Sequence, residues 1–428
     1  MQYISTATPS LRTGLTNAIV HPVAPDGGIY MPASLPVVPR AFFNNIDQLR
    51  PADIAYVVAN TLFGDDVDGA VLKRITAESC SYRMPVRRIA DRLYVMELFH
   101  GPSLSFKDFG TRFLARLYRH LASQSAVRHI NVLVATTGNS GSAIADAFRG
   151  LDGVDVFILY PHGSLTRMQE AQFATLGGNT HPLEVHGTID DCNRLVDAAL
   201  VDRQLNAELH LASANSLNLG RVLPQVTYFF EACARLQSAG LDPSATDFAM
   251  PCGNLSNVTA AAIAKRMGAP IGGITGACRP GAFADLAAGG TFPPFDISDS
   301  YPANMPRLGC LYTGDADALR RDIRAEVFTE QQQEDAVREV LERTGYIAEP
   351  RSASAILSLM RRPDSRRPGI AMVNTHPAKF LDKMTEITAR AIELPLQLNR
   401  AMGAVVRKER IYPTLPALRK ILLKHNLI

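Results

Sequence analysis

Lys107 is the residue of this sequence best suited to covalent chemistry. It stands in the segment Glu97–Phe109, ELFHGPSLSFKDF, at the first turn of a predicted helix. Because the amino end of a helix carries partial positive charge, we expect the pKa of this lysine to be lowered. An amine must lose its proton before it can form a Schiff base. The alternative is a surface lysine, which is the usual state of an isolated lysine, although Phe106 beside it makes full exposure less favourable.

Other loops combine glycine with asparagine, serine or threonine, and each opens a predicted helix. The first is Ala135–Ala143, the second Ser213–Arg221 and the third Pro251–Val258. Glycine allows close backbone approach, and N–H groups at a helix start can bind phosphate or carboxylate. Arg221 can form paired hydrogen bonds with either anion. Each loop alone is also an ordinary turn with a helix cap. A lysine and such loops together indicate a lysine-linked cofactor with a phosphate group, a description that suits pyridoxal phosphate.

The elements that must position these loops alternate between strand and helix. Apolar runs predict strands at 92–99, 130–135, 154–160, 248–250 and 369–373, and helical spacing predicts helices at 106–123, 142–148, 168–176, 190–205, 219–237 and 258–266. In the helix 106–123, Ser105 and Asp108 are expected to form an approximate capping box. This alternation indicates an α/β fold with parallel sheets flanked by helices. Ligands of such sheets bind beyond the carboxyl ends of the strands, where the loops above lie.

Composition and charge exclude several classes of function. The formal net charge of +3 gives no broad basic field, so we expect no nucleic-acid partner. The six cysteines are scattered with no zinc-like spacing, so no metal site is predicted, and they suit a reducing compartment. The first residues lack the pattern of a signal peptide, and no apolar run reaches the roughly 20 residues of a membrane span. We therefore expect a soluble, cytoplasmic protein of two or three domains.

The motifs resemble those of the threonine synthases, a family of pyridoxal-phosphate enzymes with the fold called type II. Glu97–Phe109 is similar to the family signature E-L-F-H-G-P-[TS]-x-[AS]-F-K-D-F, and 376–380 is identical to its H-P-A-K-F. Further similar segments are 24–28, 136–141, 169–170, 187–192, 213–221 and 253–257. The resemblance implies an α/β fold of type II with a small N-terminal domain. We expect that domain over residues 1–92, a catalytic region over 93–380 with a substrate-side subdomain at roughly 125–225, and a C-terminal helical segment over 381–428.

The resemblance also implies roles for individual residues. Lys107 would carry pyridoxal phosphate and act as the catalytic base. The other cofactor-binding residues would be Phe106, Asn139, Gly253, Asn254, Leu255, Ser256, Asn257 and Asn374. The substrate-binding residues would be Thr137, Gly138, Ser140, Ser213, Asn215, Ser216 and Arg221. The loop 137–141 would hold the substrate carboxylate, and the loop 213–221 would hold its phosphate.

Several positions depart from the family pattern. The carboxylate loop is TGNSG where S-G-D-T-G is usual, and Leu255-Ser256 replaces Phe-Gly in the cofactor phosphate loop. Asn374 stands where the family has the threonine that faces the pyridine nitrogen, and its amide could donate to an unprotonated ring nitrogen. The family segment A-T-N-x-N-D is replaced around 276–281.

The resemblance implies conversion of O-phospho-L-homoserine and water into L-threonine and phosphate. The departures leave open a phospho-lyase that releases 2-oxobutyrate, or a replacement enzyme for another activated amino acid. A non-catalytic sensor is a further alternative, although a sensor would not require a Schiff-base lysine. The expected partner is a small phosphorylated amino acid, and the sequence leaves the oligomeric state open.

Overall fold

The computed structural model describes residues 1–124, 129–294, 302–362 and 366–426. Its larger sheet has the strand order β12-β11-β10-β13-β5-β4, and all neighbours are parallel except β4 and β5. The strands are β4 (Val86–Ala90), β5 (Leu93–Glu97), β10 (Asp247–Cys252), β11 (Ile274–Cys278), β12 (Ile323–Val327) and β13 (Gly369–Val373). Every residue of β13 is buried, as expected for a parallel strand covered on both faces.

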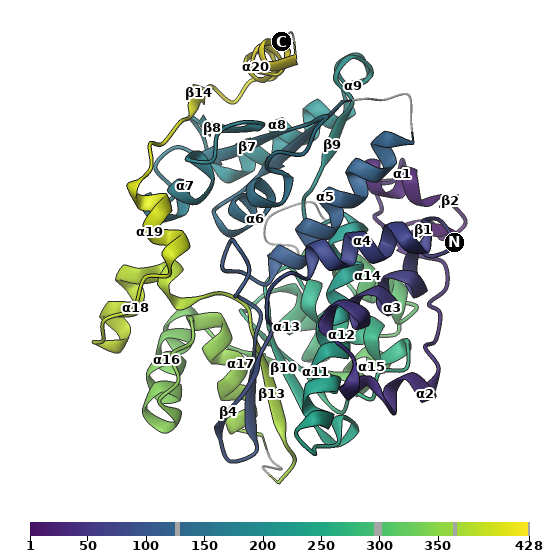
Figure 1. The fold of residues 1–428 in the computed structure, drawn as a ribbon, viewed down its shortest axis with the longest axis vertical. Coiled ribbons are helices and arrows are strands. Elements are labelled where there is room, and N and C mark those ends of the chain that lie inside the picture. The colour runs from purple at the N-terminus through teal and green to yellow at the C-terminus, as the bar shows by residue number, and fades with distance from the viewer. Residues whose placement is uncertain (125–128, 295–301, 363–365, 427–428) are drawn as a thin grey trace.

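The smaller sheet is wholly parallel, with the order β14-β8-β7-β6-β9. Its strands are β6 (Ile130–Ala135), β7 (Val154–Pro161), β8 (Thr180–Val185), β9 (Leu211–Ser213) and β14 (Glu409–Ile411). Figure 1 shows this sheet above the larger one, with the chain after β13 running up one side to reach it. The α/β fold with parallel sheets flanked by helices is therefore confirmed.

Helices cover both sheets. The helices after the strands of the smaller sheet are α6 (Asn139–Phe148), α7 (Arg167–Ala174), α8 (Ile189–Val201) and α9 (Arg203–Leu209), and α20 (Leu415–Asn426) packs against α8 and α9. Helix α5 (Lys107–Ser123) packs against α6, α4 and α10. The helices that pack on the larger sheet or beside those that do are α10 (Leu219–Val222), α11 (Val226–Ser238), α12 (Ser256–Arg266), α13 (Ala282–Ala287), α14 (Met305–Leu311), α15 (Ala316–Asp322), α16 (Glu330–Thr344) and α17 (Pro350–Met360). α18 (Leu381–Thr388) and α19 (Leu396–Gly403) connect the two layers.

The N-terminal region forms a small antiparallel sheet with helices beside it. Its elements are β1 (Tyr3–Ser5), β2 (Arg12–Thr13), α1 (Leu15–Val20), β3 (Tyr30–Pro32), α2 (Arg40–Phe43), α3 (Pro51–Phe63) and α4 (Gly69–Ser79). Residue 92, the predicted end of the N-terminal domain, lies in the turn of the β4–β5 hairpin. The predicted C-terminal segment contains β14 as well as helices, and the division into domains stays a prediction.

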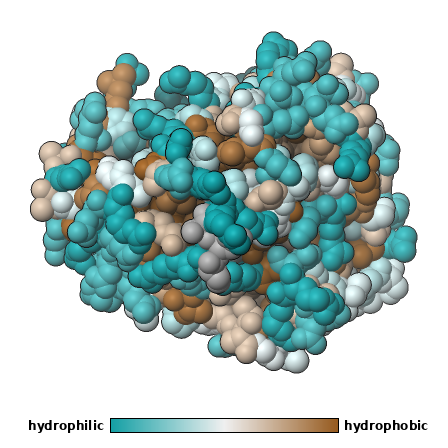
Figure 2. Space-filling model, turned by 90° about the horizontal axis from the view of Figure 1, so that it is seen from below, coloured by the Kyte–Doolittle hydropathy of each residue, from teal (hydrophilic) through white to brown (hydrophobic). Residues whose placement is uncertain are grey.

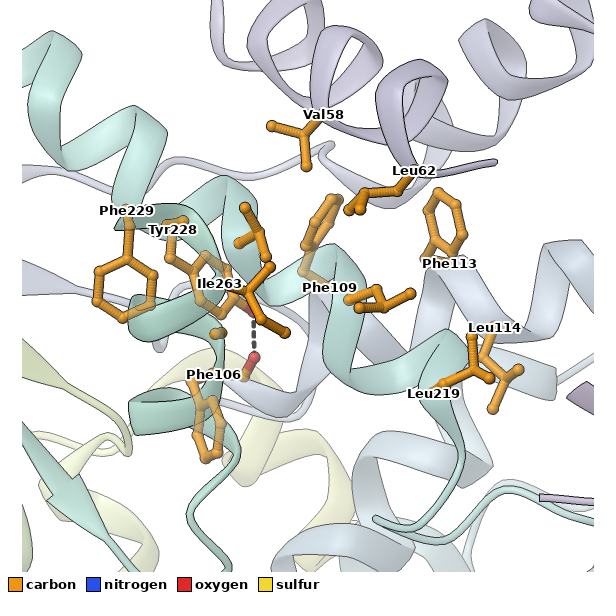
Figure 3. Close-up of a cluster of buried hydrophobic side chains, with 14 of the residues drawn as sticks. Val58, Leu62, Phe106, Phe109, Phe113, Leu114, Leu219, Tyr228, Phe229 and Ile263 are labelled. Atoms are coloured by element: carbon orange, nitrogen blue, oxygen red, sulfur yellow. Dashed lines mark hydrogen bonds between the residues drawn. The ribbon is translucent and has the colours of Figure 1, made fainter. Parts of the chain in front are cut away.

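Helix α5 packs its apolar side against the N-terminal region. Phe109 and Phe113 are at most 1% exposed, and Figure 3 shows them among Val58 and Leu62 of α3 and Tyr228 of α11. The four-residue spacing read from the sequence therefore does mark the buried side of this helix. Burying each such side chain contributes roughly 1.5–3 kcal/mol. This packing fixes the first turn of α5, where Lys107 lies.

The predicted capping box of α5 is wrong. The Asp108 carboxylate accepts a hydrogen bond from the N–H of Ser103, at 3.0 Å, and the residue before the helix, Phe106, makes no side-chain cap. The reason is that Ser103 turns back over the helix start and presents its own N–H to the buried carboxylate. Through this hydrogen bond, the fully buried Asp108 carboxylate holds the loop before the helix in place.

The outer surface is mostly polar. Figure 2 shows one face on which hydrophilic residues predominate and hydrophobic residues are scattered among them. Within the described ranges, no helix is long and apolar enough to cross a membrane.

Candidate active site

Lys107 is the first residue of α5, after the loop that follows β5, and its side chain is partly buried. Its Nζ donates to Ser140 Oγ at 2.7 Å. The preceding residue is fixed from two sides: the N–H of Phe106 donates to the carbonyl of Asn374 at 2.7 Å, and its carbonyl accepts from the Tyr228 hydroxyl (Figure 3). The lysine therefore projects from a backbone that packing and hydrogen bonds hold rigidly.

Burial is the largest cause that lowers the pKa of Lys107 to about 7, because desolvation disfavours the ammonium form. Repulsion by Arg221, Arg351 and Lys379 lowers it further. The predicted direction is confirmed, but the helix terminus named in the sequence analysis is not the principal reason. The amine is accordingly able to lose its proton near neutral pH.

The loop 136–141 follows β6 and opens α6. Thr136 Oγ accepts hydrogen bonds from the N–H groups of Gly138 and Gly141, both at 3.0 Å. Gly138 has φ 131°, a region that other residues rarely adopt, and a Cβ there would lie 3.2 Å from Gln169. Asn139 Oδ1 is buried and has no hydrogen-bond partner in the described part of the chain. Thr137 is exposed, so its side chain makes no part of the buried wall.

The loop 253–257 follows β10 and opens α12 two residues earlier than predicted. Leu255 has φ 61°, a left-handed conformation that costs a leucine roughly 1–2 kcal/mol and is typical of functional turns. Asn254 Oδ1 accepts from the Ser256 N–H at 3.1 Å. Asn257 Nδ2 donates to Asn374 Oδ1 at 2.9 Å, while Asn257 Oδ1 is buried and accepts no hydrogen bond from a described residue. The side chains of two predicted cofactor residues are therefore in direct contact.

The loop 213–221 contains a buried cation. Arg221 is 4% exposed, and its Nη1 donates to the carbonyl of Ala214 at 2.7 Å. In the part of the chain that the structure describes, no carboxylate forms an ion pair with it, and burial lowers its pKa to about 10. A buried guanidinium without a counter-ion is costly, so this site favours an anionic ligand. Ser213 is buried with its Oγ bonded to the N–H of Asn215, so it faces its own loop.

Asn304 was missed by the sequence analysis, and it joins two of these loops. Its Nδ2 donates to the carbonyl of Asn254 at 3.0 Å and to that of Ser216 at 3.5 Å. Together with Lys107–Ser140, Phe106–Asn374 and Asn257–Asn374, this contact links all the predicted loops into one site. No local pattern in the sequence marks Asn304, because its importance comes only from long-range packing.

Arg307 was missed for the same reason. It is fully buried, and its guanidinium donates to the carbonyls of Tyr30 and Leu217 and to Asn304 Oδ1. It thus fastens the N-terminal region to the site, and burial lowers its pKa to about 9. A buried arginine cannot be told from a surface one by spacing alone.

Replacing Arg307 by methionine should lower the free energy of unfolding by about 3 kcal/mol. The change leaves three buried oxygen acceptors without a donor, and each costs about 1–3 kcal/mol, offset by relief of the buried charge. Urea unfolding followed by circular dichroism measures it. An unchanged free energy of unfolding would show that these contacts do not hold the N-terminal region in place.

Comparison with known proteins agrees with this geometry. Residues 83–375 match the family described as pyridoxal-phosphate dependent enzyme, and residues 2–80 match the family described as threonine synthase N terminus. The chain is 32% identical to threonine synthase of Serratia marcescens, over 96% of both chains, and 31% identical to that of Escherichia coli strain K12, over 97% of both.

The similarity to solved structures covers nearly the whole chain. Threonine synthase from Escherichia coli has a TM-score of 0.88 at 28% identity, covering 99% of this chain and 100% of that one. Pyridoxal-phosphate-bound threonine synthase from Brucella melitensis has a TM-score of 0.91 at 26% identity, covering 99% of both chains. A partly buried lysine between such loops, on this fold, is the arrangement of a type II pyridoxal-phosphate enzyme. Within that class, the chain belongs to the threonine synthase family.

Proposed function

We propose that this protein converts O-phospho-L-homoserine and water into L-threonine and phosphate, with pyridoxal phosphate as its cofactor. The observation that carries the proposal is the presence at one site of Lys107, an amine with a lowered pKa, and the buried Arg221, a cation that has no counter-ion among the described residues. The first suits a base and cofactor attachment point, and the second suits a phosphate group. The six cysteines are free, which supports a cytoplasmic location.

The residues at the site suit pyridoxal phosphate. The start of α12, with Gly253 to Asn257 before and within it, offers N–H groups for a phosphate. Because Asn374 Oδ1 is occupied by Asn257, its Nδ2 is the group left to face an acceptor such as a ring nitrogen. The buried oxygens of Asn139 and Asn257 that lack donors are further places where a bound group can complete the hydrogen bonding.

Lys107 is the base that this chain supplies. Pyridoxal phosphate, when bound, supplies an electron sink for negative charge beside the substrate amino group. The Lys107 amine takes the proton from the substrate Cα and then a proton from Cβ. The C–O bond at Cγ breaks, and phosphate leaves with its electron pair. Water adds its hydroxyl group at Cβ, while its proton and the two protons taken by Lys107 are passed to Cγ, Cα and the phosphate, which gives threonine.

The remaining residues hold the two anionic ends of the substrate. Arg221, with Asn215 and Ser216, would bind the phosphate and stabilise its negative charge as it leaves. The loop 137–141, with Gly138 and Ser140, would bind the carboxylate at the start of α6. Because Ser140 also accepts from Lys107, substrate binding at this loop would place Cα beside the base.

The product identifies the reaction. The purified, cofactor-loaded protein is incubated with O-phospho-L-homoserine, and the products are identified by mass spectrometry. We expect threonine and phosphate in equal amounts. Release of 2-oxobutyrate instead would identify a phospho-lyase, and unchanged substrate would refute the proposed substrate.

The rate of cofactor uptake should depend on pH in a way that reports the pKa of Lys107. With a pKa of about 7, the amine is mostly protonated at pH 6 and mostly free at pH 8. Uptake of pyridoxal phosphate by the apo-protein should therefore rise about tenfold from pH 6 to pH 8 and then level off. Stopped-flow absorbance measures it, with a blocked lysine in the same buffers correcting for ionisation of the cofactor. A rate that keeps rising above pH 8 would show an ordinary lysine pKa.

A further inference from the structure

Lys379 is a second lysine at the site, and its side chain is buried. It lies in the 3-10 helix η4 (Pro377–Phe380), a few residues after Asn374, and is 2% exposed. Its Nζ donates to the carbonyl of Ser103 at 2.7 Å and to Ser142 Oγ at 3.2 Å. Among the described residues it forms no ion pair with a carboxylate. A buried ammonium is costly, so its place needs an explanation beyond packing.

The contacts of Lys379 form a continuous path through the site. On one side, the Ser103 carbonyl accepts from Lys379 while the Ser103 N–H donates to the Asp108 carboxylate, next to Lys107. On the other side, Ser142 Oγ accepts from Lys379 and donates to the carbonyl of Asn139 at 3.3 Å. Lys379 therefore joins the start of α5, which carries the base, to the start of α6, which carries the loop 137–141.

The buried charges of Asp108 and Lys379 favour the binding of an anion at the loop 137–141. Asp108 and Lys379 are both buried, and desolvation raises the pKa of the carboxyl and lowers that of the ammonium. They form no ion pair, and Asp108 Oδ1 has no hydrogen-bond partner among the described residues. The charge of Lys379 is therefore incompletely compensated, directly behind the first turn of α6.

We propose that Lys379 is a positioning residue that holds the loop 137–141, through Ser142, in the conformation that binds the substrate carboxylate. The proposal rests on the proposed function, because it takes that loop as the carboxylate site. Ser142 fixes the Asn139 carbonyl, so loss of the Lys379 contact frees the first turn of α6 to shift. A shift of this loop weakens carboxylate binding before it affects the reacting atoms.

The test compares ligands that differ only in the carboxylate. L-threonine and L-threoninamide are titrated into the cofactor-loaded protein, and binding is followed by the absorbance of the cofactor. The unsubstituted protein should prefer the carboxylate ligand. In Lys379→Met, this preference should fall roughly 10-fold to 100-fold, as expected for loss of hydrogen bonds from a charged group. The KM for O-phospho-L-homoserine should rise by a larger factor than kcat falls.

Ser142→Ala keeps the buried cation and removes the two hydrogen bonds that link it through Ser142 to the Asn139 carbonyl, so it serves where Lys379→Met does not fold. It should reduce the preference in the same direction by a smaller factor. Lys383→Met is the matched control, because Lys383 lies on α18, is 41% exposed and pairs with Glu330 and Glu334. It should leave the preference unchanged.

Two results would overturn the proposal. One is an unchanged preference in a folded Lys379→Met protein, and the other is an unchanged preference in Ser142→Ala. Either result would mean that Lys379 contributes only to the stability of the fold. The preference is a binding measurement, so it is obtained even if O-phospho-L-homoserine is not turned over. Failure of the proposed function and failure of this inference are thus distinguishable.

The variant should also shift the pH dependence of cofactor uptake. The cations that face Lys107 are Arg221 from α10, Arg351 from α17 and Lys379 from η4, while Ser140 faces it from α6 and Asp108 is the acid beside it on α5. Removing the charge of Lys379 removes one repulsive contribution, so uptake in Lys379→Met should level off at a higher pH. This shift reports the repulsion between Lys379 and Lys107, whereas the carboxylate preference reports the contact between Lys379 and Ser142.

Discussion

Replacing Lys107 by alanine should lower threonine formation by at least about 1000-fold. The change removes the base that moves protons at Cα and Cβ, and base catalysis alone contributes about 10²–10⁴-fold. It also removes the only amine that projects from α5 toward Ser140, so covalent attachment of the cofactor should be lost. The measurements are steady-state rates and mass spectrometry of the protein after reduction with borohydride, which fixes a lysine-bound cofactor.

Lys265→Ala is the control for this variant. Lys265 lies in the last turn of α12 and pairs with Asp322 at 3.0 Å. It should retain both activity and the reduced cofactor adduct. If Lys107→Ala retained either of them, the role of Lys107 would be wrong. The predicted mass shift should be located on Lys107 in the unsubstituted protein.

Replacing Arg221 by methionine should lower kcat/KM by roughly 100-fold to 1000-fold while leaving the protein as stable as before. A charge-assisted, paired contact with a phosphate is worth about 3–4 kcal/mol, and each 1.4 kcal/mol is tenfold in rate. In the free protein, however, this guanidinium donates to one carbonyl and has no ion pair among the described residues. Removing a buried, uncompensated charge relieves its desolvation cost, which offsets the lost hydrogen bond.

The two measurements for Arg221→Met are kcat/KM for O-phospho-L-homoserine and the free energy of unfolding in urea. The free energy should change by less than about 1 kcal/mol, in contrast to the loss expected for Arg307→Met. Arg307 is the matched comparison because both guanidinium groups are buried but only Arg307 serves three oxygen acceptors. A large loss of stability with unchanged kcat/KM would make Arg221 a structural residue and leave the phosphate without its cation.

Local sequence patterns predicted the helices and strands of this fold better than they predicted the contacts between them. The apolar spacing of α5 follows from the burial of Phe109 and Phe113 on one side of a helix. The predicted helix over 190–205 is two helices, α8 and α9, because Asp202 caps a new helix by accepting from the Leu205 N–H. β14 was missed because its three residues gain their strand conformation by pairing with β8.

In the candidate site, too, the sequence predicted the loops but not the residues that join them. The rule that ligands bind at the carboxyl ends of parallel strands placed the loops around Lys107, Asn139 and Asn257 correctly at strand ends. The residues that join the loops, Asn304 and Arg307, carry no local signal, because their burial is a product of tertiary packing. Lys379 was visible only as part of a motif, and its contact with Ser142 spans 237 residues of sequence.

The most direct test of the account is the fate of solvent oxygen. The cofactor-loaded protein is incubated with O-phospho-L-homoserine in water enriched in oxygen-18, and both products are analysed by mass spectrometry. Cleavage of the C–O bond followed by addition of water at Cβ predicts threonine with one oxygen-18 in its hydroxyl group and phosphate with none. Labelled phosphate together with unlabelled homoserine would mean that water attacks phosphorus, and it would contradict the assignment of Lys107 and Arg221 to an elimination reaction.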